Sequence, residues 1–143
     1  MKEVLLISEP GNDGVKSHVI DLLTTISKEK FKLTYIYSLH RYDSIYLDQI
    51  NGLKKEHNVE CIRIDIHSGL SVSDISVIYK ICKFIKRNDF DLIHCHSGKA
   101  GLVGRIAAFL AGKRNLIYTP NAFPFQNNSS TIKTFFYKYA EKL

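Results

Sequence analysis

The apolar positions of the chain follow two periods, one typical of buried strands and the other of amphipathic helices. Residues 4–7 form a continuous apolar run that stops at a Pro-Gly-Asn-Asp-Gly cluster, which predicts a buried strand ending in a loop. The next apolar positions recur at helical spacing, with polar residues on the opposite face, so we expect a helix there. Its apolar stripe consists of Val15, Val19, Leu22, Leu23 and Ile26.

Strand and helix patterns then alternate along the rest of the chain. Residues 33–37 are rich in β-branched and aromatic side chains, which predicts a second strand. We expect the further elements in this order: a helix over 44–56, a strand over 59–66, a helix from 71, a strand over 91–94, a helix over 97–111, a strand over 115–119 and a last helix from about 129.

The helix expected from residue 71 has an apolar and a basic stripe. The apolar stripe, which we expect to face the core, consists of Ile75, Ile78, Cys82 and Ile85. The opposite stripe consists of Lys80, Lys83 and Arg87. A solvated helix face is one interpretation of the basic stripe, and contact with an anionic membrane surface is the other.

Strands that alternate with helices indicate an α/β fold. We expect residues 1–143 to form a single Rossmann-like domain, a three-layer α/β/α arrangement with a mostly parallel sheet. In open parallel sheets, ligands bind beyond the carboxyl ends of the strands. Three loops have that position in the expected fold, at residues 9–18, 94–101 and 119–125.

Composition and charge narrow the class of partner. The apolar content of 45% is ordinary for a soluble globular domain, and no apolar run approaches the roughly 18 residues of a membrane span. The formal charge of +6 favours anionic partners, but no basic run is interleaved with aromatic residues as in single-strand nucleic-acid binders. Cys61, Cys82 and Cys95 are widely spaced among apolar residues, which favours buried thiols in a reducing cytoplasm.

The first loop combines a flexible backbone with a histidine. Gly14 can adopt a left-handed conformation at little cost, which lets the backbone approach an anionic or hydroxyl-rich ligand. The loop contains neither a dinucleotide fingerprint nor a P-loop, so a structural turn is the alternative. His18 fits a surface histidine as well as a ligand contact.

The second loop is the most informative. His94 and His96 are two residues apart at a strand end and therefore project to one face. Ser97 is a plausible N-cap, and the helix that opens at Gly98 and Lys99 can hold a phosphate or carboxylate. No third ligand follows at a recognisable spacing, so we do not expect a metal site. The many Gly and Ala residues of the helix predict close packing on the sheet or on a ligand.

The third loop, residues 119–125, places polar and aromatic residues after a strand. They could meet a sugar ring, or form a proline-stiffened turn with Phe123 and Phe125 in a core.

Taken together, the three loops resemble the N-terminal, acceptor-side domain of family 4 glycosyltransferases, the GT-B-fold retaining enzymes that build capsular, exopolysaccharide and lipid-linked glycans. The matching segments are residues 14–19, 91–101, 104–108 and 118–125. The resemblance implies substrate-binding roles for Gly14, Val15, His18, His94, His96, Ser97, Gly98, Lys99 and Asn121.

The chain departs from the family pattern at two positions. Asp13 and Gly14 stand where the family usually has paired glycines, and Asn121 stands at a usual histidine position near the reacting sugar. Asn121 is thus the catalytic candidate by position, although an amide can hydrogen-bond a hydroxyl but cannot shuttle a proton.

The resemblance also implies an activity and its partners. The intact enzyme would transfer a sugar, with retention, from a nucleotide-sugar donor to a lipid-linked or saccharide acceptor, with no other cofactor. The donor would bind mainly in a C-terminal domain, so we expect this chain to be a truncated half, inactive alone, located in the cytoplasm and peripheral at the inner face of the membrane. The alternative is a non-catalytic binding module or the partner subunit of a split glycosyltransferase, whereas a flavodoxin-like regulator has only the fold in its favour.

Overall fold

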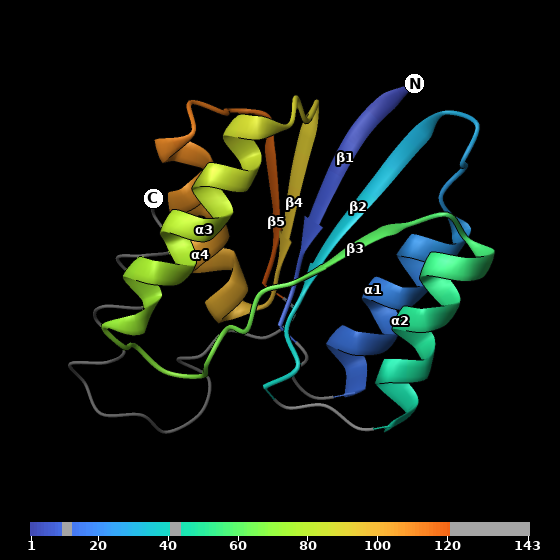
Figure 1. Cartoon of the computed structure of the whole chain (residues 1–143), viewed down its shortest axis with the longest axis horizontal. Coiled ribbons are helices and arrows are strands. Elements are labelled where there is room, and N and C mark those ends of the chain that lie inside the picture. The colour runs from blue at the N-terminus through green and yellow to red at the C-terminus, as the bar shows by residue number, and fades with distance from the viewer. Residues whose placement is uncertain (10–12, 41–43, 121–143) are drawn as a thin grey trace.

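A parallel sheet of five strands forms the centre of the protein (Figure 1). The computed structural model describes residues 1–9, 13–40 and 44–120. In chain order, the elements are β1 (Lys2–Ile7), α1 (Asp13–Thr25), β2 (Phe31–Tyr37), α2 (Ser44–Glu56), β3 (Glu60–Arg63), α3 (Ser73–Arg87), β4 (Leu92–His96), α4 (Gly98–Leu110) and β5 (Leu116–Thr119). The predicted order of strands and helices is confirmed up to this point, and the last predicted helix lies outside the described residues.

The helices cover the two faces of the sheet in pairs. Figure 1 shows α1 and α2 on one face and α3 and α4 on the other. Each pair encloses its own core, because neighbouring strand residues point to opposite faces. In β1, for example, Leu5 and Ile7 pack under α3 and α4, whereas Val4 and Leu6 pack under α1 and α2. The Rossmann-like three-layer α/β/α prediction is therefore confirmed.

The strand order β3-β2-β1-β4-β5 contains a topological switch point between β1 and β4. Ile7 at the end of β1 is in register with Cys95 of β4, so the carboxyl ends of these two strands lie side by side. From there the chain leaves β1 toward α1 on one face and leaves β4 toward α4 on the other. Such divergence opens the crevice in which doubly wound sheets bind ligands.

The third strand is shorter than predicted. It ends at Arg63 because its neighbour β2 ends at Tyr37, whose carbonyl accepts the last ladder hydrogen bond, from Ile64. Beyond Ile64, a side chain takes over from the backbone as hydrogen-bond partner. The amide of Ile66 donates to the hydroxyl of Ser38 at 3.0 Å. Residues 64–66 therefore lie outside the strand.

The predicted apolar stripe of the helix that became α3 is confirmed in part: Ile85 is buried, and Ile78 and Cys82 pack against the core, but Ile75 does not. Its buried residues are Val77, Ile81 and Ile85, whereas Ile75 is 70% exposed. Two overlapping apolar series run along this helix, and periodicity alone does not show which of them faces the sheet. In the folded protein the buried face of α3 is centred on Val77, Ile81 and Ile85, which share one core with residues of the sheet and of α4.

The small residues of α4 allow it to lie directly on the sheet. A β-carbon on Gly104 would stand 2.6 Å from the Sγ atom of Cys95, and one on Gly101 would stand 2.2 Å from the ring of Tyr118. The guanidinium of Arg105 covers that ring, with its central carbon 4.3 Å from the ring centroid. Of the two predicted reasons for the small residues, close packing on the sheet is thus confirmed at these two glycines.

All three cysteines are free thiols in the structure. Cys95 is fully buried, and burial raises the pKa of its thiol to about 12, so it is an unreactive core residue. Cys61 and Cys82 are partly buried. Over the part of the chain that the structure describes, no helix is both long enough and apolar enough to cross a bilayer.

Candidate functional site

Three histidines meet at the switch point of the sheet. His94 and His96 project from β4 toward the side covered by α1, because Ile93 and Cys95 occupy the opposite face. Their ring centroids are 3.9 Å apart, and the ring of His18, on α1, is 5.5 Å from that of His96. The structure thus brings together residues of the first and second predicted loops.

His96 is buried without a hydrogen-bond partner. The residue is 0% exposed, and neither of its ring nitrogens has a partner among the described residues. Desolvation, reinforced by the nearby His94 and His18, lowers the pKa of His96 to about 3. The imidazole is therefore neutral at physiological pH, with one nitrogen that can donate a hydrogen bond and one that can accept.

His94 lies at the partly buried edge of the same cluster. Its Nε2 atom is 2.9 Å from the hydroxyl oxygen of Thr119, at the end of β5. Burial and the neighbouring His18 lower the pKa of His94. Thr119 opens the third predicted loop, although it was not named as a binding residue, and the register that pairs His96 with Thr119 places it beside the histidines.

Ser97 links β4 to α4 in an unusual conformation. Its φ and ψ angles are 68° and 166°, a region that is populated almost only by glycine. The predicted N-cap position is confirmed, but the side chain makes no cap hydrogen bond to the helix. Two backbone hydrogen bonds hold this conformation instead. The amide of Ser97 donates to the carbonyl of Thr119 at 3.1 Å, and the carbonyl of Ser97 accepts from the amide of Gly101 at 3.0 Å.

The start of α4 lies directly beside the histidine cluster. The first amides of a helix have no partner within the helix, and they lie at the positive end of its dipole. Gly98 and Lys99 occupy these positions, immediately after Ser97. This geometry suits a phosphate or carboxylate group, as the sequence predicts.

The side chain of Lys99 reaches from α4 to the beginning of α3. Its ammonium contacts the carboxylate of Asp74 and the carbonyl of Gly69. Both members of the ion pair are largely buried, with 8% of the lysine and 14% of the aspartate side chain exposed. Asp74 was not predicted, because nothing in the sequence marks two residues so far apart as partners.

The predicted residues of the first loop lie at the N-terminal end of α1. Gly14 is exposed, and no atom lies within 4 Å of the position that a β-carbon would take there. Val15 is partly buried against the core beneath α1, whereas His18 is exposed one turn further along. His18 therefore forms the accessible rim of the cluster, and His96 forms its floor.

Two other predictions concern Asn121 and metal binding. Asn121 lies outside the described residues, so its proposed catalytic position stays a prediction. Within residues 1–9, 13–40 and 44–120, no group of three or more His, Cys, Asp or Glu side chains has an arrangement that could hold a metal ion.

The arrangement is suited to binding a polar, anionic ligand rather than to transferring protons. Two histidines have lowered pKa values and stay neutral, so they offer hydrogen bonds to hydroxyl groups. The free amides of α4 offer a place for negative charge. Two unpaired ring nitrogens cost on the order of 1–3 kcal/mol each when buried, a cost that a bound ligand can offset.

Comparison with known proteins identifies relatives of this chain. The profile of the family described as glycosyl transferase 4-like matches residues 4–142. The chain is 33% identical over 70 residues to the UDP-Gal:alpha-D-GlcNAc-diphosphoundecaprenol alpha-1,3-galactosyltransferase of Escherichia coli, a match that covers 49% of this chain and 18% of that protein. It is 37% identical over 81 residues to an uncharacterized 41.2 kDa protein in the cps region of Klebsiella pneumoniae, with 53% and 23% covered. The chain thus spans about a fifth of the length of these curated relatives.

Solved structures with the same fold include two larger proteins. MurG of Acinetobacter baumannii superposes with a TM-score of 0.62 at 14% identity, over 98% of this chain and 39% of that one. HepE of Anabaena, solved in complex with UDP and glucose, superposes with a TM-score of 0.57 at 18% identity, over 82% of this chain and 29% of that one. At such low identity these similarities establish the fold.

Proposed function

This chain belongs to the glycosyl transferase 4-like family, and from that membership we propose that it is the acceptor-binding side of a retaining glycosyltransferase. The observation that carries the proposal is the cluster of His18, His94 and His96 at the switch point, beside the free amides of α4. A sugar linked to a diphosphate has the chemistry to fill both parts, because its hydroxyls pair with imidazoles and its phosphates with helix amides.

The residues that we propose to bind substrate are those that the sequence predicts. Neutral His94 and His96 would orient sugar hydroxyls from the floor of the site, and His18 would contact the ligand at the rim. Ser97, Gly98 and Lys99 would hold the phosphate end at the opening of α4, with Gly14 and Val15 positioning the adjacent end of α1. Asn121 would hydrogen-bond the sugar at the family's histidine position.

The relative in Escherichia coli supports a proposal for the chemical class of the substrates. Its name specifies a UDP-sugar donor and an acceptor sugar on diphosphoundecaprenol. We propose the same classes for this chain, with the donor bound mainly by a second Rossmann-like domain, and a role in the synthesis of a capsular or other surface polysaccharide. Because such an acceptor is anchored in lipid, the protein would work in the cytoplasm at the inner face of the membrane.

A transfer assay tests the proposal. The chain is incubated with UDP-galactose and GlcNAc-diphosphoundecaprenol, alone and together with the C-terminal domain of a homologous glycosyltransferase, and the product is detected by mass spectrometry. We expect product only in the mixture, with retention of the anomeric configuration. If the acceptor shifts the imidazole NMR signals of His18 and His94 but no mixture transfers sugar, the chain is a binding module or partner subunit instead. If the acceptor shifts none of these signals, the proposed site is wrong.

A further inference from the structure

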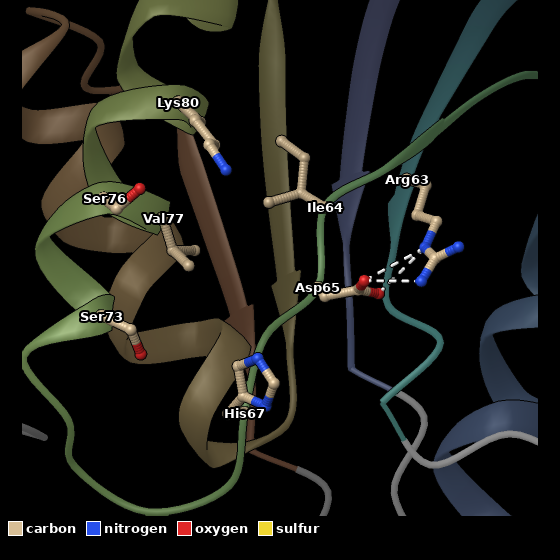
Figure 2. A pocket seen from close by; sticks show the side chains of 8 residues that line it. All are labelled: Arg63, Ile64, Asp65, His67, Ser73, Ser76, Val77 and Lys80. Carbon is tan, nitrogen blue, oxygen red and sulfur yellow. Dashed lines mark hydrogen bonds and ion pairs between the residues drawn. The ribbon is translucent and has the colours of Figure 1, made fainter.

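A cavity opens between α3 and the segment that follows β3. It has a volume of about 400 Å³, and Figure 2 shows the side chains that line it. Ser73, Ser76 and Lys80 line it from α3, where a spacing of three and four residues places them on one face of the helix. The ring of His67 lines it from the opposite wall. The volume lies within the range of small-molecule sites, about 300–1,000 Å³.

Both walls of the cavity are held in place by contacts within the protein. The hydroxyl of Ser38 accepts from the amide of Ile66 at 3.0 Å and donates to the carbonyl of the same residue at 3.3 Å. The amide of Leu39 donates to the carboxylate of Asp65 at 2.9 Å. The other wall, α3, is fixed on the sheet by its buried apolar side chains. The cavity is therefore preformed, and a ligand would bind with little ordering of the chain.

The ammonium of Lys80 is a positive charge that the cavity does not neutralise. Arg63 is paired with Asp65 at 2.7 Å, and the nearby Asp74 is held by Lys99. No acidic side chain among the described residues pairs with Lys80. Figure 2 shows the ammonium of Lys80 projecting from α3 into the cavity. An anionic ligand would supply the charge-assisted hydrogen bond that this ammonium lacks.

The rest of the lining combines an apolar floor with polar edges. Ile64 and Val77 point into the cavity from its two walls and belong to the hydrophobic core (Figure 2). Around them, Ser73 and Ser76 present hydroxyls that donate and accept, and His67 presents ring nitrogens. A pyranose ring has the same division, because its C–H face is apolar and its edge carries hydroxyl groups.

We propose that this cavity is a binding site for a sugar that carries a carboxylate or a phosphate. Lys80 pairs with the acidic group, and the hydroxyls of Ser73 and Ser76 bind hydroxyls of the ring. The apolar face of the ring rests on Ile64 and Val77. A site of this kind, largely apolar with a few convergent polar groups, is typical of small-molecule recognition.

Other classes of ligand fit this lining less well. A free phosphate would pair with Lys80 but leave the apolar floor uncovered, and a neutral sugar would leave Lys80 without a partner. A nucleobase would find no aromatic side chain in the lining besides the imidazole of His67. A metal ion would need more ligands than His67 and Asp65, and the carboxylate of Asp65 is already bonded to Arg63.

The loop before α3 connects the cavity with the proposed substrate site. His67 and Ser73 line the cavity, whereas Gly69 and Asp74, beside them in the sequence, contact the ammonium of Lys99 at the start of α4. The carboxyl ends of all parallel strands meet at one edge of the sheet, so β3 and β4 present both sites on the same side. The inference goes beyond the proposed function, which concerns the switch point, and it rests on the cavity alone.

An NMR titration of the full, isotope-labelled chain tests the site. The probes are glucuronate and glucose-6-phosphate, and the controls are glucose, which lacks the acid, and inorganic phosphate, which lacks the ring. We expect the two acidic sugars to shift the amide signals of Ser73, Ser76 and Lys80 saturably, and each control to bind at least about tenfold more weakly. Equal affinity for glucose or for inorganic phosphate would overturn the proposal, because the acid or the ring would then not be recognised.

Matched variants assign the recognition of charge to Lys80. Lys80→Met keeps the apolar stem and removes the ammonium, so we expect it to weaken the binding of both acidic sugars at least about tenfold. Lys83→Met makes the same substitution on α3 outside the cavity lining and should stay within about twofold of the parent, because a more distant surface charge is screened. Both lysines are exposed, so neither variant should disturb the fold. Equal losses in the two variants would mean that general electrostatic attraction explains the binding, and would overturn the site.

The same titration separates this site from the proposed substrate site. Ser76→Ala removes a hydroxyl that binds the ring and is expected to weaken the acidic sugars by about twofold to tenfold. If the sugars shift only the imidazole signals of His18 and His94 and no signal of α3, they bind in the histidine cluster and the cavity site is wrong. A failed transfer assay, by contrast, would leave the cavity site intact, because its test needs no catalysis.

Discussion

The imidazole rings of His94 and His96 lie 3.9 Å apart, between their centroids, on the same side of β4. Two histidines this close cannot both carry a proton without repulsion, and burial disfavours the charge on each of them further. Burial, followed by the nearby His94 and His18, lowers the pKa of His96, and burial, followed by His18, lowers the pKa of His94. His94 and His96 are therefore a neutral hydrogen-bonding pair, and the neutrality of His96 makes the fold sensitive to acid.

Acid is expected to destabilise the protein through His96. Its folded-state pKa of about 3 lies below its ordinary value of 6.5, so the unfolded chain binds more protons between these values. Stability is therefore fully present above pH 6.5 and is lost as the pH falls toward about 3, by at most about 1.4 kcal/mol per pH unit from this group. Urea unfolding at a series of pH values from 7.5 to 4 measures the slope.

The variant His96→Gln removes the titrating group and should flatten that slope. At pH 7.5 His96 is neutral in both the folded and the unfolded chain. The difference in the free energy of unfolding between parent and variant at that pH therefore reports the change in packing, and it is subtracted from the differences at lower pH. A variant that loses stability with acid as steeply as the parent would show that His96 is not buried in its neutral form.

The backbone at Ser97 stores strain that glycine should relieve. A non-glycine residue in this region costs on the order of 1–3 kcal/mol, so Ser97→Gly is expected to raise the free energy of unfolding by about 1 kcal/mol. The control Ser97→Ala also removes the hydroxyl but keeps the β-carbon, and it should not be stabilised. Thermal and urea unfolding compare the two variants. Equal stability of both would show that the serine conformation carries no strain.

The contact between α4 and β4 leaves no room for a methyl group at Gly104. Because a β-carbon there would stand 2.6 Å from the Sγ atom of Cys95, Gly104→Ala is expected to lower the free energy of unfolding by about 1–3 kcal/mol. Adding Cys95→Ala removes the clashing atom and should recover part of the loss, which a double-mutant cycle measures. Gly52→Ala on α2, where no atom lies within 4 Å, is the control and should be stabilising by about 0.5–1 kcal/mol. Additive effects at Gly104 and Cys95 would contradict the contact.

Much of the fold could be predicted from the sequence, because each strand and helix has a local pattern. The order of elements followed from periodicity, and the parallel sheet followed from their alternation. Two features could not be predicted in this way. The end of β3 depends on where its neighbour β2 stops, and the rotation of α3 depends on which apolar series fits the sheet. Both features are set by tertiary packing, and a short stretch of sequence carries no information about its packing partners.

The candidate site, like the fold, could be predicted from the sequence only in part. His94 and His96 could be placed on one face from the two-residue period of a strand. The approach of His18 to that pair, the bond from His94 to Thr119 and the positive φ of Ser97 all require the register of separate elements. The roles assigned to Asn121 and the other site residues stay predictions that binding experiments test.

The buried ion pair between Lys99 and Asp74 is expected to be worth more as a pair than its members are alone. Each side chain is largely buried, so removing one partner leaves an uncompensated charge in a poorly solvated place. Lys99→Met and Asp74→Leu are each expected to lower the free energy of unfolding by about 3–5 kcal/mol. Lys99→Met combined with Asp74→Leu replaces both charges with apolar groups and should recover most of that loss, because no charge then remains to be paired. Urea unfolding of the single and double variants measures the coupling. The more exposed pair of Lys32 and Glu3, whose side chains are 54% and 36% exposed, provides the control, and Lys32→Met should cost less than about 1 kcal/mol. Equal small losses at both pairs would mean that solvent reaches Lys99 and that α3 and α4 are not joined there.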